Sequence, residues 1–410
     1  MSKLDDLIKN LCPDGVEFKK LGEIGKFFSG LNGKNKNDFT KDGNSFFVPY
    51  MNVYQNLSVN LEQLQRVQIN DGERQNILQV GAILFTGSSE TANECGISSV
   101  LTCEPEKNLY LNSFCFGLRL NDEKILLPNF SKYIFSSKSL RKQIIKTASG
   151  VTRFNVSKKK MENVIIPVPP LEVQAEIVRI LDTFTELTAE LTAELTAELT
   201  ARKKQYECYR DLLLTFDNVE FKSLGEIAEI SAGGDVPKDR FSKNKDSKYT
   251  IPVVSNGVGS SAILGFTDIA KIKKPAVTVA ARGTIGWAEY RNYQYFPVVR
   301  LLTIIPMVSD FLNTKYLYYC LQGKKYNLPT SGIPQLTIPT IQKIKIPVPP
   351  IEEQERIVKI LDRFDKLCND ISEGLPAEIA ARQKQYEYYR DTLLMFDTQQ
   401  NGRIGDNAIR

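Results

Sequence analysis

Histidine is absent from all 410 residues of the chain. Without an imidazole, the chain lacks the commonest general base, the usual relay of serine and cysteine proteases, and the common ligands of catalytic zinc. The seven cysteines include no Cys-x-x-Cys pair, so redox and metal motifs of that spacing are also absent. These absences argue against several classes of enzyme.

Long apolar runs are missing as well. No stretch approaches the roughly 18 to 20 apolar residues that a membrane helix needs, and residues 1–10 lack the apolar core of a signal peptide. We therefore expect reduced cysteines, a cytoplasmic protein and no membrane partner. Hydrophobic residues make up 42% of the chain and charged residues 25%, which fits a folded protein of two or three domains.

Motifs of nucleotide and DNA chemistry are absent too. The chain has no Gly-x-x-x-x-Gly-Lys-Ser/Thr loop, which argues against a nucleoside-triphosphatase or helicase. Asp14 and Glu17 are too close together for the paired carboxylates of a nuclease. Both Pro-Pro pairs follow valine and precede Leu171 or Ile351, unlike the motif that holds a flipped base in amino methyltransferases. We find no catalytic constellation.

What the chain does contain is an internal repeat. Three blocks of sequence occur twice. Residues 166–187 match 346–367, and residues 202–216 match 382–396, both 180 residues further along the chain. Residues 16–30 match 219–233, 203 residues further along. The repeated blocks surround two different inserts, 31–165 and 234–345. The chain is therefore two similar halves with dissimilar inserts, the first insert being the longer.

Two long helices are predicted in the repeated blocks. Apolar residues recur at spacings of one, three and four through 171–216 and 351–396, each directly after a Pro-Pro pair. The first helix carries the run TAELTAELTAEL at 188–199, and the second is expected to break at 374–376, where Gly-Leu-Pro stands. Because each helix has an apolar stripe, we expect the two to pack together as an antiparallel coiled coil.

The inserts have the pattern of strands and turns. Short apolar runs rich in β-branched and aromatic residues are bounded by Gly, Asn, Ser and Pro. These predicted strands are 46–54, 81–85, 115–120, 251–254, 276–281 and 298–306. The expected fold class is α+β: two sheet-containing domains, two long and antiparallel helices, and an internal pseudo-twofold duplication.

Charge is unevenly distributed along the chain, whose formal net charge is +5. Residues 1–170 hold 22 basic and 17 acidic residues, and residues 217–350 hold 17 and 10. Both long helices are acidic overall. Two basic domains fit a DNA duplex contacted at two places, and they also fit ordinary surface charge.

Together these blocks resemble the specificity (S) subunit of type I restriction-modification enzymes. The resemblance rests on the duplicated IPVPP-(L/I)-E-x-Q helix start, the duplicated KQYE-x-YRD-x-LL-x-F helix end, the VEFK-x-LGEI entry to each insert, and the TAEL run. It covers nearly the whole chain. It implies five segments: a first target recognition domain, a central conserved helix, a second recognition domain, a C-terminal conserved helix and a polar tail, at 1–165, 166–217, 218–345, 346–397 and 398–410.

The resemblance also implies partners and cofactors. Each recognition domain would read one half of a split DNA target, and two methyltransferase (modification) subunits would dock on the conserved helices. Restriction/translocase subunits would complete the complex. S-adenosylmethionine, ATP and magnesium would be bound by those partners, and this chain would carry no catalytic residue, metal or cofactor. Because the inserts differ, the target is expected to be bipartite and asymmetric. Two domains that contact one face of a duplex favour half-sites about one helical turn apart.

Polar and basic residues in the insert loops are the candidates for DNA contact, since Arg, Lys, Asn, Gln, Ser and Thr read base edges or hold phosphates. In the first insert they are Lys34, Lys36, Ser88, Ser89, Thr91, Asn93, Thr152, Arg153, Asn155 and Lys158. In the second they are Lys238, Arg240, Lys243, Asn256, Arg282, Thr284, Ser331 and Gln335. A similar Gly-containing turn precedes the Pro-Pro block in both inserts, which favours Arg153 and Gln335. The alternative for each is a solvated loop residue.

Near the helix ends, Tyr206, Tyr209 and their counterparts Tyr386 and Tyr389 stand at helical spacing, which favours packing between the helices over contact with a partner. Two other functions stay open from the sequence. One is a stand-alone DNA methyltransferase or nuclease with degenerate motifs, and the other is a structural coiled-coil adaptor that does not bind DNA.

Overall fold

The computed structural model describes residues 2–326, 334–369 and 374–396, which form two compact units. Unit 1 comprises Met1–Ala193 with Ala380–Arg410, and unit 2 comprises Glu194–Ile379. The expected domain boundaries treat each helical segment as separate, whereas the compact units divide both of them. The expected polar tail lies outside the described residues.

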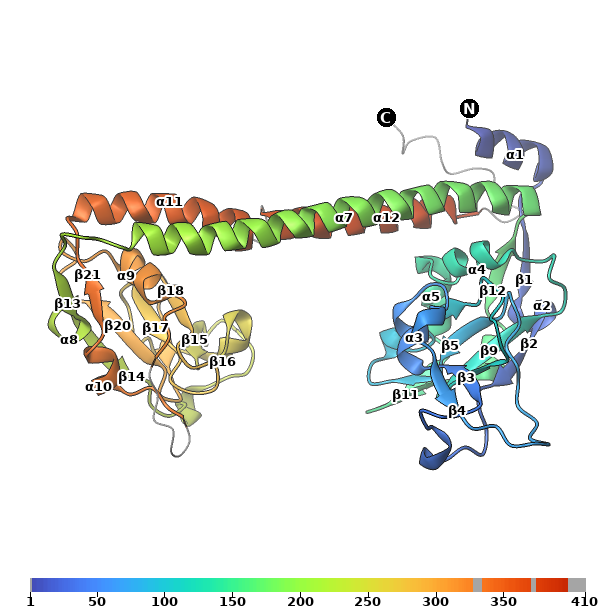
Figure 1. Ribbon diagram of the computed structural model, residues 1–410, viewed down its shortest axis with the longest axis horizontal. Helices are drawn as coiled ribbons and strands as arrows, with labels where there is room; N and C mark the ends of the chain where they lie inside the picture. Colours follow the sequence, from blue (N-terminus) through green and yellow to red (C-terminus); the bar gives the residue numbers. More distant parts are fainter. Residues whose placement is uncertain (1, 327–333, 370–373, 397–410) are drawn as a thin grey trace. The chain divides into compact units, whose positions relative to one another are not determined.

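In unit 1 short helices are interspersed among the strands, and the long helix α7 follows the last of these strands (Figure 1). Its helices are α1 (Lys3–Leu11), α2 (Leu21–Ile24), η1 (Lys36–Asp38), α3 (Tyr50–Gln55), η2 (Leu61–Gln63), η3 (Ala92–Glu94), α4 (Pro128–Ile134), α5 (Lys138–Ile145), α6 (Lys158–Met161), the first part of α7 (Leu171–Leu213) and most of α12 (Leu375–Leu393). Its strands are β1 (Glu17–Lys20), β2 (Gly25–Ser29), β3 (Ser45–Val48), β4 (Gln65–Val67), β5 (Ile83–Thr86), β6 (Ser88–Ser89), β7 (Ser98–Val100), β8 (Leu109–Leu111), β9 (Cys115–Leu120), β10 (Ala148–Gly150), β11 (Phe154–Val156) and β12 (Ile165–Val168).

Unit 2 contains the rest of α7 and the first residues of α12, together with the second insert. Its other helices are α8 (Leu224–Ile227), η4 (Lys238–Arg240), η5 (Gly259–Ala262), α9 (Thr314–Leu321), α10 (Ile338–Gln342) and α11 (Ile351–Asn369). Its strands are β13 (Phe221–Ser223), β14 (Ala228–Ala232), β15 (Ile251–Val254), β16 (Ile263–Thr267), β17 (Ala276–Val279), β18 (Ala288–Arg291), β19 (Phe296–Pro297), β20 (Leu302–Pro306) and β21 (Lys345–Pro347).

The two units share one strand topology. An antiparallel four-stranded sheet has the order β2-β9-β5-β7 in unit 1 and β14-β20-β17-β18 in unit 2. A mixed three-stranded sheet (β4-β3-β8 and β16-β15-β19) and an antiparallel pair (β1-β12 and β13-β21) recur in the same way. Corresponding strands also follow one another in the same chain order. The duplication therefore extends through the inserts, and the α+β fold class is confirmed.

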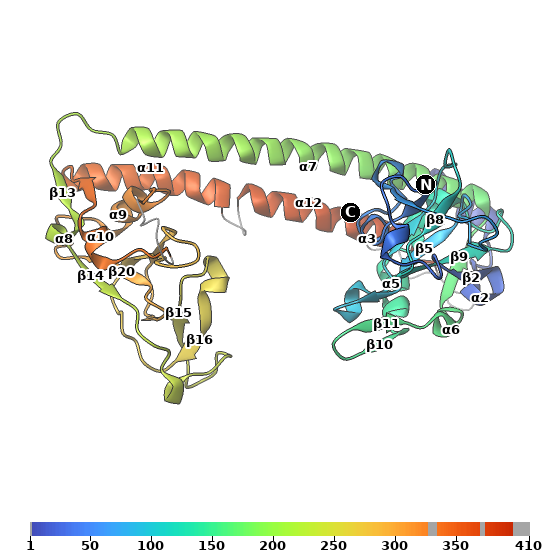
Figure 2. The ribbon, with the colours of Figure 1, turned by 60° about the horizontal axis from the view of Figure 1, so that its bottom comes forward.

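Unit 1 has a further small sheet, β10-β11-β6. Its strands β10 and β11 are seen beside α6 in Figure 2. Most predicted strands are present, and 251–254 and 115–120 form β15 and β9 with those bounds. The prediction for 46–54 is wrong in its second half, because β3 ends at Val48 and α3 begins at Tyr50. Between them stands Pro49, which has no N–H for a strand ladder and whose carbonyl oxygen accepts from the amide of Asn52 (3.1 Å).

Both long helices begin directly after a Pro-Pro pair, as predicted. Acidic residues follow in the first turn, Glu172 in α7 and Glu352 with Glu353 in α11, where they complement the helix dipole. The second helical segment is interrupted where the Gly-Leu-Pro sequence predicts it, since α11 ends at Asn369 and α12 begins at Leu375. Among the described residues, no helix is long and apolar enough to cross a membrane.

A buried glutamine connects each insert to its long helix. In unit 1 the Nε2 of Gln174 donates to the carbonyl oxygens of Ile125 (2.9 Å) and Pro169 (2.7 Å), and its Oε1 accepts from the amide of Leu127 (2.8 Å). In unit 2 Gln354 makes the same three bonds, to Phe311 (3.0 Å), Pro349 (2.8 Å) and Asn313 (2.9 Å). Leu127 and Asn313 are the N-caps of α4 and α9, so each glutamine fixes an insert helix to a long helix.

Two aromatic pairs show how the helices pack. Phe184 of α7 stacks on Tyr389 of α12 in unit 1, with ring centroids 5.7 Å apart. Phe364 of α11 stacks on Tyr209 of α7 in unit 2, at 5.4 Å. These are the same two repeat positions, so each unit pairs the helix start of one half with the helix end of the other, in antiparallel order. The predicted packing between the helices is confirmed for Tyr209 and Tyr389. The hydroxyl of Tyr206 instead donates to Oε1 of Gln322, which caps the insert helix α9.

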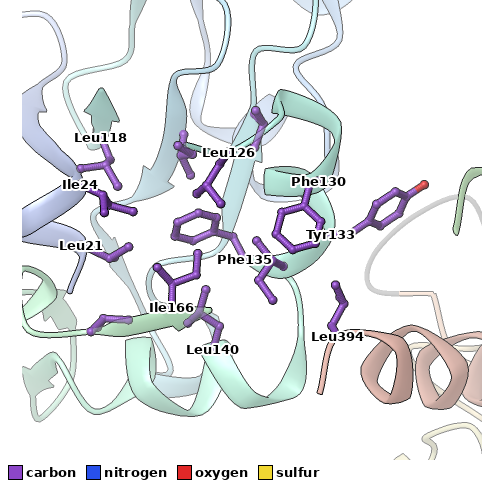
Figure 3. Packing of buried hydrophobic residues seen from close by; sticks show 14 of the residues in the cluster. Leu21, Ile24, Leu118, Leu126, Phe130, Tyr133, Phe135, Leu140, Ile166 and Leu394 are labelled. Atoms are coloured by element: carbon purple, nitrogen blue, oxygen red, sulfur yellow. The ribbon is translucent and has the colours of Figure 1, made fainter. Parts of the chain in front are cut away.

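The largest cluster of unit 1 shows the consequence for its core. Leu394, which follows α12, is 3% exposed and belongs to the same cluster as Phe130, Phe135 and Leu140. Figure 3 shows Leu394 next to Tyr133 of α4, facing these residues. Residues from the end of the second half therefore complete the core of the first.

Candidate nucleic-acid interface

Four segments that are far apart in the sequence meet on one side of unit 1. They follow β3, follow β5, precede β9 and precede β11. Together they line an open hollow of about 470 Å³, formed by Tyr50, Ser88, Ser89, Glu90, Phe114, Thr152 and Arg153. Four of the predicted DNA-binding residues are thus brought together, although about 60 residues of chain separate the two serines from Thr152 and Arg153.

Arg153 is held in this hollow by a hydroxyl group and an aromatic ring. Its Nη2 and Nε donate to Oγ of Ser88 (3.0 and 3.3 Å), and its guanidinium lies over the ring of Phe114, 5.8 Å from the centroid. The hydroxyl of Tyr50 donates to the carbonyl oxygen of Ser88 (2.8 Å). Phe114 is 59% exposed. The hollow therefore offers an oriented cation and an aromatic face, which can contact bases or sugars.

Glu94 organises the adjoining loop. Its carboxylate accepts from the hydroxyls of Thr91 (2.8 Å), Tyr54 (2.9 Å) and Ser89 (3.0 Å), and these bonds, led by Thr91, hold the pKa of Glu94 below its usual value. Arg141 of α5 donates to main-chain carbonyl oxygens of the same loop, including that of Asn93 (2.9 Å). The loop that carries Ser89, Thr91 and Asn93 is thus fixed in place, and Asn93 keeps an exposed side chain.

The remaining candidates of the first insert differ in their surroundings. The side chain of Lys34 is 3% exposed and donates to Oε1 of Glu73 (2.7 Å), so its charge is already paired. Lys158 donates to Oγ of Ser29 (2.5 Å), and partial burial lowers its pKa. Lys36 and Asn155 are exposed. None of the four lines the hollow.

The corresponding segments also meet in unit 2. Nε and Nη2 of Arg282, which follows β17, donate to Oε1 of Gln335 (3.1 and 2.7 Å). Asn256, which follows β15, accepts at Oδ1 from the amide of Ala281 (2.8 Å) and at its carbonyl from Oγ1 of Thr284 (2.6 Å). The juxtaposition of Arg282 with Gln335 in unit 2 matches that of Ser88 with Arg153 in unit 1.

Three basic candidates of unit 2 lie in another segment, at and after η4. Arg240 forms a bidentate ion pair with Asp268 (2.8 Å for both bonds), whereas Lys238 and Lys243 are exposed. Ser331 lies outside the described residues.

The structure adds residues that the sequence reasoning missed. Tyr50 and Phe114 line the hollow of unit 1, and Arg300 lies beside Gln335 in unit 2, with its Nη1 3.5 Å from Oε1. Trp287, the single tryptophan, is 48% exposed near the Arg282 loop. All four lie within two residues of an observed strand, β3, β9, β20 or β18. Only Phe114 also borders a predicted strand, 115–120, so an aromatic residue at a strand end is the signal that could have found it.

The chemistry of both faces is that of recognition. They present guanidinium, amide, hydroxyl and aromatic groups, all of which bind nucleic acids. Within residues 2–326, 334–369 and 374–396 no three His, Cys, Asp or Glu side chains are grouped so that they could hold a metal ion.

A family model agrees with this description. The model of the type I restriction modification DNA specificity domain matches the chain twice, at residues 13–201 and 217–381. The two matches correspond to the two halves of the internal repeat.

Curated relatives are similar over much of the chain. The putative type I specificity subunit S.MpnORF89P of Mycoplasma pneumoniae is 35% identical over 327 residues, covering 76% of this chain and 89% of that protein. The putative type I restriction enzyme specificity subunit S.HindORF215P of Haemophilus influenzae is 38% identical, covering 60% and 68%. The EcoR124I/EcoR124II specificity subunit of Escherichia coli is 38% identical, covering 59% and 64%.

Solved structures share the fold. A chain from work on complex assembly and conformational transition of the type I R-M system has a TM-score of 0.69 at 17% identity, covering 93% of this chain and 97% of that chain. The HsdS subunit from Thermoanaerobacter tengcongensis has a TM-score of 0.51 at 17% identity, covering 94% and 96%. At this identity the likeness concerns the fold alone.

Proposed function

The chain belongs to the family of type I restriction-modification DNA specificity subunits, and we propose that its two units read the two halves of one bipartite, asymmetric DNA target. The observation that carries the proposal is the pair of corresponding faces, one in each unit, built from the same four segments of one topology. Their side chains differ, with serine, phenylalanine and arginine in unit 1 and two arginines and amides in unit 2. Two different faces imply two different half-sites.

The DNA-contacting set that we propose centres on the residues that meet in these faces. In unit 1 these are Ser88, Ser89, Thr152 and Arg153, joined by Tyr50 and Phe114. In unit 2 they are Arg282 and Thr284, joined by Arg300, and Gln335 binds both arginines. The exposed lysines outside the faces, such as Lys36, Lys238 and Lys243, are proposed to hold phosphates, because a flexible ammonium group positions the backbone without reading bases.

Proteins of this family act together with DNA and other restriction-modification subunits. We propose that two modification subunits dock on the paired helices, because the reciprocal stacking of Phe184 on Tyr389 and of Phe364 on Tyr209 gives equivalent elements to two identical partners. Restriction subunits would join that complex. S-adenosylmethionine, ATP and magnesium would be bound by the partners, with this chain non-catalytic. The family match does not support a stand-alone methyltransferase or nuclease.

A transfer assay tests this division of labour. The purified chain is incubated with duplex DNA and labelled S-adenosylmethionine, with and without modification subunits. We expect methyl transfer only in the mixture, and salt-dependent duplex binding, which a structural adaptor would lack. Transfer by the chain alone would contradict the proposal.

Methylation mapping in the source cell tests the target itself. We expect methylated adenines in a two-part, non-palindromic sequence, and a change in one part alone when one insert is exchanged. A continuous or palindromic methylated sequence that is indifferent to both inserts would refute the reading proposed here.

A further inference from the structure

Two guanidinium groups in unit 2 share one acceptor. Oε1 of Gln335 accepts from Nε and Nη2 of Arg282 at 3.1 and 2.7 Å, and Nη1 of Arg300 lies 3.5 Å from the same oxygen. Arg282 and Arg300 come from different loops, before and after the strands β18 and β19. The glutamine therefore brings two like charges together, although their repulsion opposes that arrangement.

The loop of Arg300 is held in an unusual conformation. Val299 and Arg300 have φ angles of 53° and 60°, a region that residues with a side chain rarely adopt. Two main-chain hydrogen bonds maintain this conformation. The amide of Val299 donates to the carbonyl oxygen of Gly234 (2.9 Å), and the amide of Arg300 donates to the carbonyl oxygen of Gly233 (3.0 Å). Strain of this kind persists where the surroundings impose it, and it is typical of binding sites.

Asn256 connects the two arginine loops. Its Nδ2 donates to the carbonyl oxygen of Val299 (2.6 Å), directly before Arg300, and its Oδ1 accepts from the amide of Ala281 (2.8 Å), directly before Arg282. The amide of Leu336, next to Gln335, donates to the carbonyl oxygen of Ala281 (3.0 Å). Asn256 and Gln335 are thus engaged in holding the two loops.

The charges of the two arginines are unpaired among the residues that the structure describes, whereas their neighbours are neutralised. Arg240 binds Asp268 and Arg291 binds Glu289, each at 2.8 to 2.9 Å. No described carboxylate lies within ion-pair distance of Arg282 or Arg300. Both arginine side chains belong to exposed residues, so their charge is available to a ligand.

The orientation of Arg282 suits a bidentate contact with a base edge. Its Nε–Nη2 edge is bound to Gln335, which leaves the Nη1–Nη2 edge for a ligand. Two parallel N–H groups on a fixed plane match O6 and N7 of guanine in the major groove, the commonest specific contact of arginine with DNA. A phosphate can accept the same two bonds, but that contact would not depend on the base sequence, and the experiment below separates the two cases.

We propose that Arg282 and Arg300 read neighbouring guanines in the half-site of unit 2, and that Asn256 and Gln335 are positioning residues for them. The inference rests on the proposed function, and it adds that this half-site contains G·C pairs at the positions contacted. The second insert then owes its selectivity to a pair of arginines oriented by two amides.

The test measures methylation of a set of duplexes by the assembled methyltransferase. Each duplex carries one changed base pair in the mapped target, and the chain carries Arg282→Ala or Arg300→Ala. At one position of one half-site, we expect the preference for guanine over the other bases to be about 5- to 150-fold weaker in each variant than in the unchanged chain. The matched control is Arg240→Ala, an exposed arginine of the same unit bound to Asp268, which should leave that preference unchanged.

A second variant tests the positioning role. Gln335→Met removes the shared acceptor at similar volume, and we expect a smaller loss of preference at the same positions with an unchanged unfolding temperature of the complex. A purely structural glutamine would change the unfolding temperature and leave the base preference unaltered.

Three results would overturn the guanine inference while leaving the proposed function standing. These are a half-site of unit 2 without guanine, an equal loss of methylation on all duplexes in both arginine variants, and no loss in either. A methylated sequence that ignores both inserts would instead remove the proposed function, and with it this inference.

Discussion

Glu176 illustrates how a single residue distinguishes the two halves. Its carboxylate is 3% exposed and accepts from Nη2 of Arg179 (2.7 Å) and Nζ of Lys3 (2.8 Å), and these bonds lower its pKa to about 2. The corresponding residue of the second half is Arg356, which instead pairs with Glu353. The ion pair with Lys3 joins α1 to α7 within unit 1. Because Arg356 stands where the glutamate would be, the second half cannot form the same pair at this position.

We predict that this pair makes unit 1 sensitive to acid. The pKa of Glu176 is lowered in the folded state, so its stabilising effect is present above the ordinary value of 4.5 and is lost as the pH falls toward about 2. In Glu176→Gln, the drop in unfolding temperature between neutral pH and pH 3, measured by circular dichroism, should be smaller than in the unchanged chain. An identical drop in both proteins would show that Glu176 is not a source of the acid sensitivity.

At this scale the sequence predicted some contacts and missed others. The Gly-containing turn before each Pro-Pro block indicated Arg153 and Gln335, and both do meet the loop after the neighbouring strand. Lys34 looked equally suitable, but its partner Glu73 stands 39 residues away, and no local pattern reveals such a pair. Arg300 was missed because the sequence predicts it inside the strand 298–306, whereas β20 begins at Leu302. Main-chain bonds to the distant Gly233 and Gly234 hold residues 299 and 300 in a loop with positive φ angles.

Among the elements, the paired helices were the easiest to predict and the inserts the hardest. Apolar spacing and the Pro-Pro pairs indicate where α7 and α11 begin, because these signals are local. The common topology of the inserts was invisible in the sequence, since a strand requires only an apolar pattern and different side chains can satisfy it. The repeated blocks showed the duplication only outside the inserts.

The glutamine bonds yield a prediction about an element junction. Gln174→Ala would leave a buried amide and two carbonyl oxygens without their partner, at a cost of about 1 to 3 kcal/mol for unit 1. Gln354→Ala should cost unit 2 a similar amount. Chemical denaturation of both variants, followed by hydrogen exchange to locate the loss, measures this. Loss of protection in the unit that keeps its glutamine would contradict the assignment.

The TAEL run within α7 supports a second prediction for elements. Deleting 192–195 removes one repeat and shortens the helix by about 6 Å. If α7 sets the distance between the half-sites, the unread gap should shrink by one or two base pairs while both half-sites stay the same. Replacing Thr188, Thr192 and Thr196 by alanine keeps the length and serves as the control. A methylation map with an unaltered gap after the deletion would refute this role.

For the whole molecule, the important feature is that unit 1 is completed by the end of the chain. Leu394 is 3% exposed in the cluster of Phe130 and Leu140, which lie more than 250 residues earlier. We predict that Leu394→Ala destabilises unit 1 by about 2 to 5 kcal/mol, as expected for a large-to-small change in a core. The control is Met395→Ala, a neighbour that is 71% exposed. Calorimetry of Leu394→Ala should show a lower unfolding temperature for unit 1 and an unchanged one for unit 2. Equal effects of the two variants would contradict the role of Leu394 in the core.

The bonds of Gln174 and Gln354 have an evolutionary consequence. On the insert side each glutamine binds only main-chain atoms, a carbonyl oxygen and an amide, which almost every amino acid supplies. If recombination replaces an insert by another of the same topology, the new insert can therefore form the same bonds to the glutamine, whatever its side chains are. An exchange of one insert could therefore change the DNA half-site that is read while the long helices and their glutamine bonds stay the same.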